Sequence, residues 1–171
     1  MKKILVALAL IMSSFLVNAQ NSAVDQLFAK YADKDGFTTV SISKAMFSLF
    51  ASESESKDEF NQAVRGLESI RILAPDSATA MKMKLNFYND IIKNLPIAQY
   101  EELMSVKEKD QVFKMLIRKK GNVITEFLMI GGGNENLLIS ITGNIDLKSI
   151  SKLSKAMNIE GMDELDKVNK K

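Results

Sequence analysis

Apolar and polar positions alternate most regularly between residues 111 and 142. Two alternating segments lie on either side of the turn Lys120-Gly121-Asn122, and the run Gly131-Gly132-Gly133-Asn134 leads into a third apolar segment at residues 137–142. Alternation with a period of two, interrupted by short glycine-containing turns, is typical of successive antiparallel strands. This part of the chain therefore predicts a three-stranded antiparallel meander.

Before residue 100, apolar residues recur in several segments at the spacing of an amphipathic helix. The longest of these helices is predicted to begin near Asp76, a residue suited to capping a helix start, and to end where Pro96 stops it. The predicted helical segments are Val24 to Tyr31, a turn at residues 46–50, Phe60 to Leu67 after an acidic loop at 52–59, and Met81 to Leu95.

Two short segments in the same part of the chain predict strands. Residues 37–43 and 69–74 are rich in β-branched side chains, which favour a pleated sheet. Residues 99–106 fit both a helical turn and the beginning of a strand, and periodicity does not decide between them.

After the meander, Asp146 is placed to cap a helix with Leu147, Ile150, Leu153 and Met157 on its apolar side. Residues 159–171 fit a second short helix or a frayed tail. The order of elements indicates an α+β fold. We expect an antiparallel sheet made of the C-terminal meander and one or two N-terminal strands, with helices mainly on one face.

Residues 1–19 have the pattern of a secretory signal peptide. Lys2 and Lys3 precede an apolar run from Ile4 to Leu16, and small residues at 17 and 19 suit cleavage after Ala19. The apolar run is shorter than a membrane-spanning helix requires. We therefore expect a periplasmic or secreted protein whose mature part, residues 20–171, is a single domain.

Composition narrows the chemistry of this domain. The chain has no cysteine and no histidine, so lipid attachment through cysteine, thiolate nucleophiles and the commonest general base and metal ligand are all missing. Removing the two leader lysines leaves 23 − 2 = 21 basic residues against 21 acidic ones, which does not favour nucleic-acid binding. The sequence predicts no cofactor and no metal site.

Four residues are candidates for a binding site, and each also has a structural explanation. Asp35 lies in Asp33-Lys34-Asp35-Gly36, which resembles a calcium loop but lacks carboxylates at both ends of the pattern, so a turn is favoured. Gly132 could let backbone amides approach a phosphate, although a glycine run between two strands is usually a hairpin. Glu126 and Asp146 could form a catalytic carboxylate pair. A salt bridge from Glu126 to Arg118, and a helix cap at Asp146, are the simpler explanations.

Several blocks of sequence resemble a known family. They are Phe28-Ala29-Lys30-Tyr31, residues 34–44 with Met46-Phe47, Tyr100 to Met104, and Gly143 to Leu147. Over essentially the whole mature chain these blocks are similar to small exported proteins, found mainly in Bacteroidetes, that contain domain of unknown function 4252. Many members resemble lipoproteins, whereas this chain lacks the cysteine. The resemblance implies an envelope location and carries no catalytic residues.

The sequence favours a non-enzymatic binding module that contacts an envelope protein or a small ligand. One alternative is a carboxylate-dependent hydrolase of envelope glycan or peptide. Another is a structural or assembly protein that pairs through an exposed sheet edge.

Overall fold

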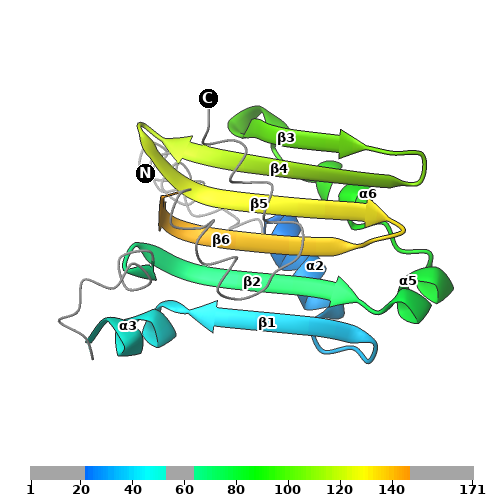
Figure 1. The fold of residues 1–171 in the computed structure, drawn as a ribbon, viewed down its shortest axis with the longest axis horizontal. Helices are drawn as coiled ribbons and strands as arrows, with labels where there is room; N and C mark the ends of the chain where they lie inside the picture. Colours follow the sequence, from blue (N-terminus) through cyan, green and yellow to red (C-terminus); the bar gives the residue numbers. More distant parts are fainter. Residues whose placement is uncertain (1–21, 53–63, 147–171) are drawn as a thin grey trace, which may run out of the picture.

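Six strands form one antiparallel sheet in the computed structural model, which describes residues 22–52 and 64–146 (Figure 1). The strands lie in the order β1-β2-β6-β5-β4-β3, so the first two strands in sequence extend the C-terminal meander on one side. Their bounds are β1 (Phe37–Ser43), β2 (Leu67–Pro75), β3 (Glu101–Lys107), β4 (Gln111–Lys120), β5 (Val123–Gly133) and β6 (Leu137–Ile145). The predicted α+β class is confirmed, with more strands than expected.

The additional strand is β3, which occupies the segment that periodicity left open. It pairs with β4 at the edge of the sheet opposite β1. The predicted meander is confirmed as β4, β5 and β6. The prediction that the glycine run forms a turn is wrong. Gly131 to Gly133 continue β5 in register with Phe113, Val112 and Gln111, and the chain turns at residues 134–136.

The predicted helix from Asp76 to Pro96 is interrupted. Asp76 caps α5 (Ser77–Met83) as expected, by accepting a hydrogen bond from the Thr79 N–H at 2.6 Å. Lys84 then adopts a left-handed conformation with φ 50° and ends the helix. A new helix, α6 (Phe87–Ile92), starts where Asn86 accepts from the Asn89 N–H at 2.9 Å. The C-terminal cap at Lys84 and the N-terminal cap at Asn86 therefore divide a segment whose apolar pattern alone predicts one helix. After α6, a 3₁₀ turn, η2 (Ile97–Gln99), leads to β3.

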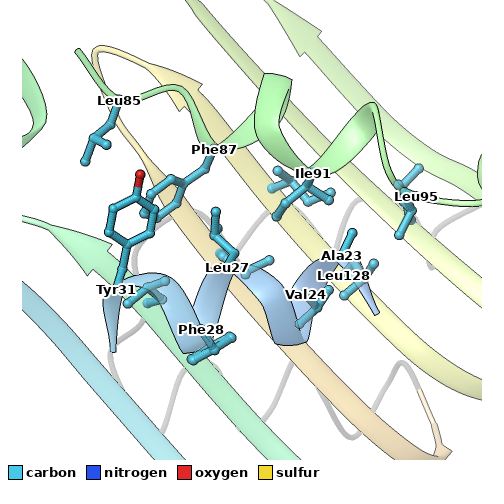
Figure 2. Packing of buried hydrophobic residues seen from close by; sticks show 14 residues of the cluster. Ala23, Val24, Leu27, Phe28, Tyr31, Leu85, Phe87, Ile91, Leu95 and Leu128 are labelled. Carbon is cyan, nitrogen blue, oxygen red and sulfur yellow. The ribbon is translucent and has the colours of Figure 1, made fainter. Parts of the chain in front are cut away.

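Helices α2 (Ala23–Tyr31) and α6 cover one face of the sheet (Figure 2). A capping box fixes the start of α2, because Ser22 accepts from the Asp25 N–H while Asp25 accepts from the Ser22 N–H. All four residues of the predicted apolar stripe are buried. The cluster they join consists of Ala23, Val24, Leu27, Phe28, Tyr31, Leu73, Leu85, Phe87, Ile91, Leu95, Leu116, Leu128, Ile130 and Leu138.

A second buried cluster lies on the other face of the sheet. Helix α3 (Lys44–Ser52) confirms the predicted turn at 46–50, and its Phe47 packs in this cluster with Val64. The structure describes only the second half of the predicted helix from Phe60 to Leu67; there the chain turns at residues 65–66, and Leu67 is already the first residue of β2, so the predicted end of that helix is wrong. The predicted leader at residues 1–19, and the predicted helix and tail after Asp146, lie outside the described residues.

Candidate functional site

A buried ion pair crosses the β4–β5 hairpin. Glu126 lies directly opposite Arg118 in the strand register, and an Arg118 guanidinium nitrogen is 2.7 Å from Glu126 Oε2. Glu126 is only 5% exposed, whereas 43% of the Arg118 side chain remains accessible. The predicted salt bridge is confirmed, in a position where the carboxylate is enclosed and its cation reaches solvent.

Tyr100, just before β3, completes this cluster. Its hydroxyl donates to Glu126 Oε2 at 2.9 Å, and the Arg118 guanidinium lies 5.6 Å from the centre of its ring. Burial and the negative charge of Glu126 raise the pKa of the Tyr100 phenol well above its ordinary value. The phenol is therefore a protonated donor at neutral pH, and Glu126 Oε2 contacts two neighbours at once, the Tyr100 hydroxyl by a hydrogen bond and Arg118 by an ion pair.

The cluster borders a pocket of about 470 Å³ where the start of α2, the end of α6 and the sheet meet. Two amide side chains, Gln26 and Asn94, line it from the helical side. The full lining is Ser22, Ala23, Gln26, Asn94, Leu95, Pro96, Tyr100, Arg118 and Glu126. The pocket therefore combines one ion pair, amide groups and a few apolar surfaces.

This arrangement is suited to binding more than to acid–base catalysis. Hydrolysis by paired carboxylates needs a second acid within roughly 5–10 Å across the substrate. Among the described residues that line the pocket, Glu126 is the one carboxylate, and Arg118 and Tyr100 already hold it. Residues 22–52 and 64–146 also contain no cluster of three acidic residues able to hold a metal ion.

Gly132 has a structural role that explains the glycine run. A Cβ at this position would lie 2.5 Å from Asn86 Oδ1 and 2.8 Å from the backbone nitrogen of Tyr88. The start of α6 therefore rests directly on β5, and only a residue without a side chain allows this approach. Asn86 and Tyr88 occupy the space beside Gly132, so the glycine run does not form a phosphate-binding loop.

Asp35 and Asp146 lie away from the pocket and from each other. Asp35 is exposed in the turn between α2 and β1, beside Gly36, whose φ of 82° confirms the turn predicted there. Asp146 is exposed directly after Ile145, which pairs with Ile124 at the opposite end of β5 from Gly132. The four sequence candidates are thus dispersed, and Glu126 alone lines this pocket.

The remaining pocket residues were not among the sequence candidates. Pairing of Arg118 with Glu126 follows from hairpin register, but Tyr100 reaches them only because the chain crosses from β2 to the far edge of the sheet. Asn94 and Gln26 come together through helix packing. The presence of Tyr100 in one of the family-like blocks was the available signal.

Comparison with known proteins identifies the family of this α+β domain. The family model described as "Domain of unknown function (DUF4252)" matches residues 31–153, and the chain belongs to this family. No curated protein and no solved structure matches the chain. Within the described ranges, no helix has the length and apolar character needed to cross a membrane.

Proposed function

We propose that this protein is an exported, non-enzymatic binding module of the bacterial envelope. Its ligand site is the pocket at Arg118, Tyr100 and Glu126, and its ligand is a small polar molecule that carries a carboxylate. The leader-like pattern of residues 1–19 supports export. The absence of histidine and cysteine from the sequence supports binding without turnover.

The observation that carries this proposal is the unequal exposure of the ion pair. Glu126 is enclosed, accepts a hydrogen bond from Tyr100 and forms an ion pair with Arg118, so it orients the guanidinium. Arg118 is 43% exposed, and a guanidinium has further N–H donors in a planar fork that matches a carboxylate. Asn94 supplies an amide beside it for the remaining polar groups of a ligand.

Titration of the ¹⁵N-labelled protein with acidic monosaccharides and with di- and tripeptides tests this site. We expect at least one probe to shift the Arg118 and Asn94 side-chain signals at millimolar concentration. Asn94→Ala should weaken that binding several-fold. Asn89→Ala is the matched control, because Asn89 is an exposed asparagine in α6, just before Asn94 in the sequence, and lies outside the pocket lining. A panel in which no probe perturbs these signals contradicts the proposed site.

A carboxylate-dependent hydrolase is the second candidate, because Glu126 is a buried carboxylate beside a pocket. The same glycans and peptides, assayed for cleavage, separate the two functions. We expect no turnover in the parent chain. Turnover that disappears in a folded Glu126→Gln variant would replace the binding function with hydrolysis.

A further inference from the structure

The two edges of the sheet differ in charge and regularity. The outer strand β1 has the sequence Phe-Thr-Thr-Val-Ser-Ile-Ser, which contains no charge and no proline, and it pairs with β2 without a register shift. Strands without these interruptions are the ones that pair with other chains. No strand in the described part of the chain lies on the outer side of β1 (Figure 1).

The opposite edge, β3, carries the features that prevent such pairing. Glu101 and Glu102 form ion pairs with Lys119 and Lys114, the first at 2.6 Å. The register of β3 shifts between Glu102 and Met104, and the strand ends in Lys107. Charges and bulges protect an edge strand from association. The protein therefore protects one edge and leaves the other regular and neutral.

Hydrogen bonding to β2 identifies which backbone groups of β1 face outward. The Asp76 N–H donates to the Gly36 carbonyl at 2.8 Å, so Gly36 faces β2. Antiparallel pairs alternate between bonded and non-bonded positions, and the continuous register places Thr38, Val40 and Ile42 on the β2 side. The backbone groups of Thr39, Ser41 and Ser43 therefore point away from the sheet.

We propose that β1 pairs with β1 of a second copy of this chain, in an antiparallel arrangement with a two-fold axis at Val40. In this register Thr39 of each copy faces Ser41 of the other, and Phe37 faces Ser43. Thr39 and Ser41 then exchange both of their backbone hydrogen bonds across the axis, and the Ser43 N–H reaches the Phe37 carbonyl. The Phe37 N–H already donates to the Lys34 carbonyl, so the pairing gives roughly six new backbone hydrogen bonds. A two-fold axis suits antiparallel pairing of identical strands, and it joins the two sheets into one.

Charge and side chains favour a second copy as the partner. The pairing places Gly36 opposite Lys44 of the other copy, so Asp35 of each chain approaches that lysine. The strands themselves are neutral, so no like charges meet. On one face Val40 contacts its own symmetry mate, and on the other the Thr39–Ser41 pairs lie side by side. The small contact predicts association in the micromolar range or weaker.

Sedimentation equilibrium of the chain produced from its full-length gene tests the dimer. We expect concentration-dependent dimers that Ser41→Lys weakens by about tenfold, because lysines are brought together beside the axis. Ser105→Lys is the matched control, because Ser105 is an exposed serine on the protected edge β3. A protein that stays monomeric at high micromolar concentration, or a dimer that both variants affect equally, overturns the proposal.

A cysteine cross-link tests the register independently of Ser41→Lys. Val40 and its symmetry mate form a non-bonded pair with Cα atoms about 4.5 Å apart, which is compatible with a disulfide. The chain has no native cysteine, so Val40→Cys introduces the one thiol present. We expect rapid formation of a disulfide-linked dimer by Val40→Cys and little by Val106→Cys on β3. Equal cross-linking of the two variants, or none, excludes this pairing.

Discussion

The two halves of strand β5 hold two of the four residues that the sequence suggests for a site, Glu126 and Gly132, and both are enclosed, with opposite consequences for ligand binding. At Glu126 the enclosed carboxylate holds an arginine that reaches a solvent-facing pocket. At Gly132 the missing side chain lets the start of α6 occupy the space, so nothing is left for a ligand. A residue type that suits binding or catalysis therefore forms a site only where the neighbouring helices and strands leave space for a ligand beside it.

The glycine end of β5 is expected to give the larger loss when it is altered. In Gly132→Ala the new Cβ meets Asn86, which caps α6, and the backbone of Tyr88, so the helix must move away from the sheet. Overpacking of this kind reduces the free energy of unfolding by about 2–3 kcal/mol. Urea denaturation measures the effect.

Gly121→Ala is the control for that variant. Gly121 has φ 62° in the β4–β5 turn, and a Cβ there would meet nothing within 4 Å. The expected loss is the cost of a left-handed alanine alone, about 1 kcal/mol. Equal losses for the two variants would show that α6 does not rest on Gly132.

The polar end of β5 should respond next most strongly. Glu126→Gln keeps the shape of the side chain but removes the charge that Arg118 and Tyr100 contact. Since the ion pair is lost and the Tyr100 hydroxyl then donates to a neutral amide oxygen, while Arg118 can still reach water, we expect a loss of about 2 kcal/mol in unfolding free energy. Glu102→Gln, which alters an exposed ion pair with Lys114, should cost less than about 0.5 kcal/mol. Similar losses would contradict a special role for the buried pair.

Tyr100→Phe removes one hydrogen bond to the same carboxylate and should lower the unfolding free energy by about 1 kcal/mol at neutral pH.

The same variant should also change how the stability of the protein depends on pH above neutrality. The pKa of Tyr100 is raised in the folded protein, so the unfolded chain loses this proton first as the pH increases. The folded protein therefore loses stability as the pH rises above about 10, and Tyr100→Phe should reduce that loss. Chemical denaturation between pH 8 and about 11 measures it; an unchanged slope in the variant would contradict the assignment.

Local pattern was sufficient for much of this fold. The alternation of residues 111–142 gave the meander, and hairpin register alone placed Arg118 beside Glu126. Residues 37–43 became β1 with the predicted bounds. The meander depends on contacts between neighbours in the sequence, which periodicity and turn residues encode directly. Strand β1 pairs with the more distant β2, but its run of β-branched residues was sufficient to predict it.

Features that depend on distant contacts were not predictable in the same way. The helix break at Lys84 depends on how Asn86 lies against Gly132 and on the hydrogen bond from the Phe87 N–H to Asn136. The strand at Glu101–Lys107 is a different case: its pairing with β4 is local, but its short apolar pattern fits a helix as well as a strand. The glycine run predicts a turn at Gly132, wrongly, because its actual role, to leave room for α6 to pack on β5, depends on a distant segment. The pocket joins three such segments, so Glu126 could be proposed but its surroundings could not.

Ser140 should show the smallest effect, although it lies fully buried opposite Leu128, between the two ends of β5, on the same face as Glu126. Its hydroxyl has no hydrogen-bond partner among the groups described, whereas Ser69 shares a 2.8 Å hydrogen bond with Thr142. Ser140→Ala removes an unsatisfied polar group and should leave the unfolding free energy unchanged or slightly higher, while Ser69→Ala should lower it by about 0.5–1 kcal/mol. Urea denaturation of both variants compares them directly. A clear loss for Ser140→Ala would mean that this hydroxyl takes part in a polar site that extends from Glu126 along the strand, and the contrast between the two ends of β5 would then be less sharp than the geometry indicates.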